Sequence, residues 1–266
     1  MKKRVLSAIV LVAVFVPFLI IGELPFKVFM SVLGVMGLYE LLRVHETRKK
    51  FPFFLKLLAY VLTVYLCLYN TGTIDFYYQF DYRVMAFLIF LFLSPMVFIH
   101  NFDTYNLSDA LFLIGSILFI SFGFNLIINT RNYDISYMIY LLLVTTITDT
   151  FALFTGTLVG QHKLCPKISP KKTIEGLIGG VFMGTFIATA FYVTVISSGV
   201  SLWIVILSTL ALCLVGQLGD LIFSSMKRYY DVKDFSELIP GHGGILDRFD
   251  SLLFVNLAFI FLFGVL

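Results

Sequence analysis

Residues 201–223 read S-L-W-I-V-I-L-S-T-L-A-L-C-L-V-G-Q-L-G-D-L-I-F, and residues 224–250 continue S-S-M-K-R-Y-Y-D-V-K-D-F-S-E-L-I-P-G-H-G-G-I-L-D-R-F-D. The first run is long and apolar enough to cross a bilayer, which takes about 17–25 residues. The second run is rich in charge, and even the mildest scale assigns a cost of about 2.5–3.5 kcal/mol to a charged side chain at membrane depth. A charged cluster directly beside a membrane span therefore predicts a functional site at a membrane surface.

The composition extends this pattern to the whole chain. Of the 266 residues, 59% are hydrophobic and 13% are charged, against about 25% charged in an ordinary soluble domain. Because no soluble core could bury so much apolar surface, the predicted fold class is an all-α polytopic integral membrane protein. The apolar run 5–21 is longer than a signal-peptide core of about 7–15 residues, and no small-residue cleavage site follows it, so it is predicted to be the first span. The three cysteines form no C-x-x-C pair, so neither a zinc site nor a disulfide framework is indicated.

The apolar runs predict about nine transmembrane helices, at residues 5–22, 26–42, 53–70, 84–100, 107–130, 136–158, 174–197, 201–223 and 249–266. With the N-terminus in the cytoplasm, every Lys and Arg except Lys27, Arg83 and Arg131 falls on the cytoplasmic side. This is the distribution that the positive-inside rule describes. It predicts a multi-pass inner- or plasma-membrane protein whose two basic loops, Lys163–Lys172 and Lys227–Arg248, face the cytoplasm.

Two regions are predicted along the chain. Residues 1–135 are expected to be a scaffold of N-terminal transmembrane helices, with lipid or dimer contacts left open. Residues 136–266 are expected to be a catalytic transmembrane region with two cytoplasmic phosphate-binding loops. Within it, Gly176, Gly180 and Gly184 recur every four residues, a spacing that lets helices approach closely. Packing inside the subunit is the favoured interpretation of this repeat, and a subunit interface is the alternative.

A polar stripe marks the C-terminal end of span 201–223. Gln217, Asp220, Ser224 and Lys227 follow one another at spacings of three, four and three residues, which places them on one helical face. A lone intramembrane aspartate is often a protonated packing residue. Here the stripe leads directly to Lys227 and Arg228, which favours a functional site.

Two further acids stand where the last span is expected to begin. Asp247 and Asp250 are three residues apart, so both carboxylates lie over one turn at the positive end of the helix dipole. Helix capping with an Asp–Arg248 pair is the simpler interpretation. The preceding Gly243 and Gly244 argue for more, because adjacent glycines let backbone N–H groups fold around phosphate oxygens. For His242, which lies beside them, the roles of general base, hydrogen-bond donor and loop anchor all stay open.

The other basic loop reads I-S-P-K-K-T-I-E-G over residues 168–176. Ser169 is predicted to be a helix N-cap with Pro170 at the first helical position. Lys171, Lys172 and Thr173 would then crowd a helix N-terminus, which is an anion site; the alternative is a pair of snorkelling lysines.

A third buried acid is Asp149, which we expect to share a cation with Asp220 or Asp247. The G-x-x-x-x-G-K-[ST] sequence does not occur, so a P-loop nucleotide site is excluded.

At this point the chain resembles the phosphatidate cytidylyltransferases, also called CDP-diacylglycerol synthases. Their signature is S-x-φ-K-R, four residues, K-D, then a short spacer to φ-P-x-H-G-G-φ-x-D-R-φ-D, where φ is apolar. The fixed positions all match, at Ser224, Lys227, Arg228, Lys233, Asp234, Pro240, His242, Gly243, Gly244, Asp247, Arg248 and Asp250. The loop Ser169–Thr173 matches as well. The resemblance covers residues 145–251, and the earlier spans match only in being hydrophobic.

The resemblance implies a Mg²⁺-dependent reaction in which CTP and phosphatidate give CDP-diacylglycerol and pyrophosphate, with a second cation left open. The implied metal ligands are Asp149, Asp220, Asp247 and Asp250. The implied catalytic residues are Asp220, Asp247, Lys227, Arg228 and Asp250. The implied substrate-binding residues are Ser169, Lys171, Lys172, Thr173, Ser224, Lys233, Asp234, His242, Gly243, Gly244 and Arg248.

The partners implied are CTP from water, phosphatidate from the cytoplasmic leaflet and the surrounding membrane lipids. No nucleic acid is expected, and a homodimer is left open. Three alternatives come from other classes of protein. A CTP-dependent lipid kinase would release CDP in place of pyrophosphate. A cation-coupled transporter would carry symmetric repeats with broken helices, and a non-catalytic lipid-binding scaffold would have no use for the acids.

Overall fold

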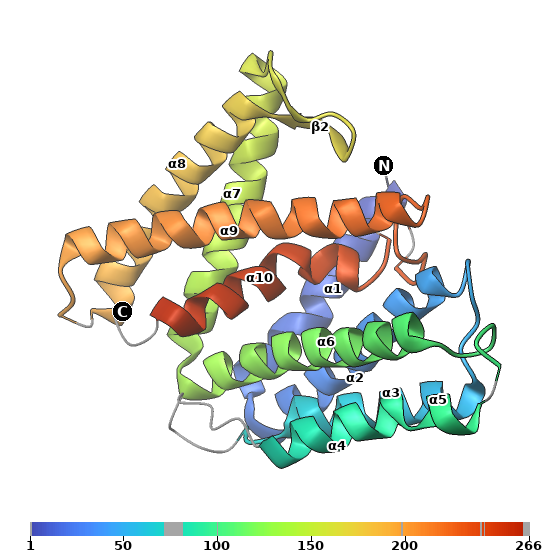
Figure 1. Ribbon diagram of the computed structural model, residues 1–266. Coiled ribbons are helices and arrows are strands. Elements are labelled where there is room, and N and C mark those ends of the chain that lie inside the picture. The colour runs from blue at the N-terminus through green and yellow to red at the C-terminus, as the bar shows by residue number, and fades with distance from the viewer. Residues whose placement is uncertain are drawn as a thin grey trace. The chain divides into compact units, whose positions relative to one another are not determined.

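The computed structural model describes residues 2–71, 82–99, 101–197, 199–239, 241 and 243–262, with the side chains of residues 2–6 and 8 left out. Within these ranges the helices fall into nine segments, which coincide with the nine predicted spans. One short two-stranded sheet accompanies them in the same ranges (Figure 1). The prediction of an all-α polytopic membrane protein is confirmed.

The first compact unit comprises residues 1–129 together with residues 235–245. Its helices are α1 (Lys2–Ile21), α2 (Glu23–His45), α3 (Phe53–Leu68), α4 (Tyr82–Leu93), α5 (Pro95–Phe98) and most of α6 (Leu107–Tyr133). Asn125 of α6 fastens the end of α3, because its amide nitrogen donates to the carbonyl oxygens of Leu66, Cys67 and Tyr69 at 3.2, 3.0 and 2.7 Å. The last carbonyls of a helix lack the N–H groups of a following turn; Leu66 also accepts from the backbone N–H of Tyr69 at 3.3 Å, and the Asn125 amide adds a donor from a neighbouring helix.

The second unit comprises residues 130–234 and 246–266. Its elements are α7 (Ile135–Val159), β1 (Lys163–Cys165), β2 (Ser169–Thr173), α8 (Ile174–Phe191), the π-helical turn η1 (Tyr192–Ile196), α9 (Leu202–Tyr229) and α10 (Leu246–Leu262). Figure 1 shows α7 and α8 lying along each other, with the β1–β2 hairpin projecting from the end where they meet. The hairpin therefore connects the C-terminal end of α7 to the N-terminal end of α8.

Length and composition show which helices are able to cross a membrane. Among the described residues, five helices are long and apolar enough to span a bilayer. They are α2, α6, α7, α8 with η1, and α9. Shorter apolar helices lie at Ile9–Ile21, Phe53–Leu68 and Tyr82–Phe98. The last of these is interrupted where Pro95 begins α5, as expected for a residue that cannot continue a preceding helix.

The glycine repeat brings α8 against α7 inside the chain. A methyl group on Gly176 would lie 2.6 Å from the carbonyl oxygen of Ala152, and one on Gly180 would lie 2.5 Å from that of Thr148. One on Gly184 would collide with the Thr148 hydroxyl. Only glycine permits this backbone approach, so the expected packing role within the subunit is confirmed.

One local prediction is wrong. Ser169 and Pro170 do not begin a helix; they lie in β2, and α8 begins at Ile174. The N-cap is Thr173, whose hydroxyl accepts a hydrogen bond from the backbone N–H of Gly176 at 3.1 Å. Ser169 and Thr173 offer the same capping chemistry. Residues 169–173 pair with β1 as a strand, so the helix begins only after Thr173.

Candidate active site

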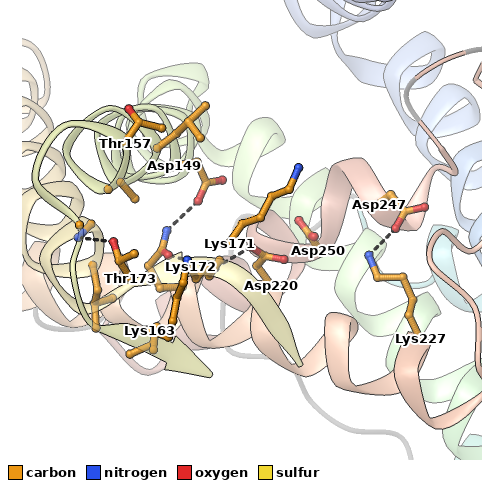
Figure 2. A pocket seen from close by; sticks show the side chains of 18 of the residues that line it. Asp149, Thr157, Lys163, Lys171, Lys172, Thr173, Asp220, Lys227, Asp247 and Asp250 are labelled. Atoms are coloured by element: carbon orange, nitrogen blue, oxygen red, sulfur yellow. Dashed lines mark hydrogen bonds and ion pairs between the residues drawn. The ribbon is translucent and has the colours of Figure 1, made fainter. Parts of the chain in front are cut away.

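A polar cavity of about 720 Å³ lies within the second unit (Figure 2). Its walls come from α7, the hairpin, α8, α9 and α10. Five aspartates line it, namely Asp149, Asp220, Asp234, Asp247 and Asp250. Five cationic side chains line it as well, namely Lys163, Lys171, Lys172, Lys227 and Arg248. A volume of this size fits a small-molecule ligand, and the mixture of charges suits a metal-bound polyanion better than an apolar ligand.

The β1–β2 hairpin brings lysines to one wall of the cavity. Lys163 pairs with Thr173 across the two antiparallel strands, so the strand that carries Lys171 and Lys172 is held beside the one that carries Lys163. The base of the hairpin is closed by Glu175, whose carboxylate accepts hydrogen bonds from the backbone N–H groups of Gln161 and His162 at 3.1 and 3.2 Å. The strand pairing and this closure position the lysines together.

A network of five side chains joins the hairpin to α9 and α7. The Lys172 ammonium lies 2.6 Å from a carboxylate oxygen of Asp220 and donates to the Gln217 amide oxygen at 3.1 Å. The Gln217 amide nitrogen donates to Asp149 at 2.7 Å, and the Ser224 hydroxyl donates to Asp220 at 3.2 Å. Gln217, Asp220 and Ser224 share one face of α9, as the stripe predicted.

A second lysine–aspartate pair lies where α10 begins. The Lys227 ammonium is 2.6 Å from a carboxylate oxygen of Asp247, and the two side chains are only 10% and 3% exposed. Asp247 occupies the first turn of α10, as predicted, so the helix dipole also stabilises its negative charge. In the view of Figure 2 this pair stands to one side of Asp220 and Asp250.

The carboxylates suit a hard cation. Asp149, Asp220 and Asp250 all line this one cavity. Among the described residues, no three His, Cys, Asp or Glu side chains are grouped closely enough to hold an ion by themselves. Mg²⁺ does not need such a cage, because it usually keeps several waters and takes one or two carboxylates plus substrate phosphates. The donor set of the cavity fits that mode of binding.

The predicted site residues fall into three groups. Those that line the cavity are Asp149, Lys171, Lys172, Thr173, Asp220, Lys227, Asp234, Asp247, Arg248 and Asp250. Ser169, Ser224, Arg228 and Lys233 belong to the same unit but are not among the lining residues. Gly243 and Gly244 belong to the other unit, and His242 lies outside the described residues. The chemical roles assigned to all of these residues stay predictions.

Arg228 is not among the residues that line the cavity, and its side chain binds backbone carbonyl groups. Its guanidinium donates to the carbonyl oxygen of Ile168 at 3.3 Å, in the turn of the hairpin, and to that of Val232 at 2.9 Å. It therefore ties the end of α9 to the hairpin that carries Lys171 and Lys172.

Sequence reasoning missed Lys163, which lines the cavity as Thr157 does. Recognising residues 163–173 as a hairpin would have found Lys163, because its cross-strand partner is Thr173. The sequence offers a signal for it in Pro166 and Pro170, which disfavour a helix there.

Comparison with known proteins decides the family. The model of the cytidylyltransferase family matches residues 2–266. The chain belongs to the cytidylyltransferase family. It is 38% identical over 256 residues to the phosphatidate cytidylyltransferase of Staphylococcus aureus strain COL, covering 96% of each chain. It is 35% identical over 269 residues to the phosphatidate cytidylyltransferase of Bacillus subtilis strain 168, covering 100% of this chain and 98% of the relative.

The match also extends the sequence resemblance. The signature and the hairpin loop were confined to residues 145–251, whereas the family match reaches through the N-terminal helices. These helices are therefore part of the family's common structure.

Proposed function

We propose that this protein transfers a cytidylyl group from CTP to phosphatidate, giving CDP-diacylglycerol and pyrophosphate for phospholipid synthesis. The observation that carries the proposal is the cavity of the second unit, in which five aspartates face five cationic side chains beside membrane spans. Two polyanionic substrates require both kinds of charge in one place. The names of the relatives support the same activity.

The reaction is a displacement at phosphorus. An oxygen of the phosphatidate phosphate attacks the α-phosphorus of CTP, a P–O bond forms there, and the bond to the β-phosphate oxygen breaks with release of pyrophosphate. The attacking oxygen already carries negative charge, so no side chain has to remove a proton from it. The protein's task is to bring two anions together and to stabilise the charge on the leaving pyrophosphate.

The cationic side chains divide this task. Lys163, Lys171 and Lys172 on the hairpin are suited to bind the phosphates of CTP, and Arg248 at the start of α10 is suited to bind the lipid phosphate. Mg²⁺, held by Asp220 and Asp250 with Asp149 or Asp247 nearby, would neutralise phosphate charge and polarise the reacting phosphorus. Asp220 would hold this cation in place of its contact with Lys172, and the Lys172 ammonium would then be available to a phosphate oxygen.

The experiment that tests this proposal follows the label from CTP. Purified protein is incubated with phosphatidate, Mg²⁺ and CTP labelled in the α- or the γ-phosphate. We expect label from the α-phosphate in a lipid with the mass of CDP-diacylglycerol, together with released pyrophosphate. Label from the γ-phosphate in the lipid, together with CDP, would overturn the proposal and identify a lipid kinase.

We also propose that the cavity opens to the cytoplasm and that phosphatidate enters from the inner leaflet. The asymmetric distribution of Lys and Arg supports this orientation. Lys167→Cys, in the exposed turn of the hairpin, should react with a membrane-impermeant thiol reagent only from the cytoplasmic side. Labelling from the outer side would refute the orientation. A homodimer and a second cation stay predictions.

A further inference from the structure

A buried acid in the N-terminal unit organises the loop that carries the paired glycines. Glu40 lies near the C-terminal end of α2, and the exposed fraction of its side chain is 0%. One carboxylate oxygen accepts hydrogen bonds from the Ser236 hydroxyl at 2.6 Å and from the backbone N–H of Ile245 at 2.8 Å. A buried carboxyl group is costly unless hydrogen bonds compensate for lost hydration, so these contacts account for its presence in an apolar helix.

The loop is shaped to receive this carboxylate. A methyl group on Gly244 would collide with both carboxylate oxygens of Glu40, so only glycine allows the backbone to pass there. The loop is also closed on itself, because the backbone N–H of Ile239 donates to the carbonyl oxygen of Gly243 at 2.9 Å. Gly243 has a φ of 84°, a backbone conformation that residues other than glycine rarely adopt. The structure therefore explains why glycine is needed at two positions of the signature: Gly244 makes room for the Glu40 carboxylate, and Gly243 closes the loop.

Two aspartates of the cavity flank the residues that Glu40 anchors. Ser236 is two residues after Asp234, and Ile245 is two residues before Asp247. Both aspartates line the cavity of the second unit. Two residues of chain span at most about 7 Å. Fixing Ser236 and Ile245 therefore restricts where each aspartate can lie, whatever the rest of the loop does.

We propose that Glu40 is a positioning residue for the cytidylyl transfer: it holds both ends of the loop 235–245 and thereby the two cavity aspartates that flank the loop. This inference rests on the proposed function. It gives the N-terminal unit a part in the reaction, where the sequence predicted a scaffold. Glu40 acts through Ser236 and Ile245, so its loss should lower turnover more than substrate affinity.

The test uses the full chain and four variants. Glu40→Leu removes the acceptor, Glu40→Gln keeps one carbonyl oxygen that can accept both bonds, and Ser236→Ala removes one donor. Asp109→Asn is the matched control, because Asp109 is also a buried acid of the first unit, 3% exposed, and pairs with Lys49. The measurements are kcat and KM for CTP, the thermal inactivation temperature, and amide hydrogen exchange over residues 235–247.

We expect Glu40→Leu to lower kcat about 100-fold, the scale of loss from a displacement of about 1 Å in an active site, with little change in KM. Its loop amides should exchange faster. Glu40→Gln should fall between Glu40→Leu and the wild type, and Ser236→Ala should show a smaller loss of kcat. Asp109→Asn should lower the inactivation temperature and leave kcat and loop exchange unchanged.

Several results would overturn the inference. They are a wild-type kcat in Glu40→Leu, loop exchange unchanged by it, or an equal loss of kcat in Asp109→Asn, which would make the effect one of general destabilisation. If Glu40→Leu does not fold, an unchanged kcat and exchange in both Ser236→Ala and Glu40→Gln would refute the proposal. If the wild type makes no CDP-diacylglycerol, the proposed function fails, and the exchange measurement still decides whether Glu40 anchors the loop.

Discussion

The cavity contains two lysine–aspartate pairs of equal length and different exposure. Lys172–Asp220 and Lys227–Asp247 both have 2.6 Å between nitrogen and oxygen. The side chains of the first pair are 20% and 27% exposed, and those of the second are 10% and 3% exposed. The same two residue types therefore sit in two dielectric environments within one cavity.

Exposure decides what each pair can do. A solvent-exposed ion pair contributes about 0–1 kcal/mol. The half-buried Lys172–Asp220 pair lies closer to that limit than the buried pair does, so its partners can separate at a lower cost when phosphate and cation bind. Removing one partner of a buried pair costs about 3–5 kcal/mol, because the other charge is left uncompensated. Lys227–Asp247 is therefore suited to hold α10 against α9, and Lys172–Asp220 is suited to exchange partners during binding.

The largest expected effect comes from breaking the buried pair. Lys227→Met removes the ammonium that lies 2.6 Å from the buried Asp247 carboxylate, so we expect stability to fall by about 3–5 kcal/mol and activity to be lost. The measurements are the thermal inactivation temperature in detergent and the rate of CDP-diacylglycerol formation. The double variant Lys227→Met, Asp247→Leu should recover stability without activity. A stable single variant would show that the pair is not a structural lock.

Next in size is the loss of the half-buried Asp220 carboxylate. Asp220→Asn keeps the shape of the side chain and removes a charge that the proposed cation needs. We expect turnover to fall by about two orders of magnitude or more, on the scale of losing a single electrostatic catalytic group, while the thermal inactivation temperature changes little. Asp247→Asn should lower both quantities. If Asp220→Asn stays near wild-type activity, Asp220 does not hold the cation.

The polar stripe shows what the sequence could predict. Gln217, Asp220, Ser224 and Lys227 were placed on one face by the 3.6-residue period alone, and the structure joins the first three through Lys172 and Asp149. The face of a helix on which a residue lies follows from local spacing alone, and a long apolar run in a membrane can satisfy its backbone hydrogen bonds within itself only as a helix. The same reasoning correctly placed the spans and the start of α10.

The hairpin and Glu40 show where that reasoning ended. Ser169 carried a valid capping signal, but pairing with residues 163–165 decided the structure. Pro166 and Pro170 argue against a helix there, but they do not indicate which residues pair. Glu40 meets Ser236 and Ile245, which lie 196 and 205 residues away. A charged acid in an apolar span is costly without partners, but tertiary packing decides which residues those partners are, and Glu40 was not singled out from the sequence. The sequence therefore indicated the residue types of the site better than their contacts.

A smaller effect is expected at the hairpin end of the cavity. The double variant Lys171→Ala, Lys172→Ala removes two cations from the wall, so the KM for CTP or phosphatidate should rise about 10- to 100-fold, the range for lost hydrogen bonds to charged groups. Steady-state kinetics on the purified protein measure this. Membrane orientation should not change. If only the expression level falls and both KM values hold, these lysines determine topology and do not bind substrate.

The smallest effect is expected at Lys163, the cavity residue that the sequence did not single out. It is exposed and reaches the wall through its pairing with Thr173, so a contact from it to a phosphate would be screened by water. Lys163→Ala should raise the KM for CTP about three- to tenfold and leave kcat unchanged, since an exposed charge contributes about 1 kcal/mol. Lys167→Ala is the matched control, because Lys167 is also exposed on the hairpin and is not among the lining residues. The rise in KM for Lys163→Ala should shrink at high salt, because salt screens exposed charges. Equal effects of the two substitutions would mean that the hairpin acts through its net charge, and that the exposed end of the cavity has no defined phosphate contact at Lys163.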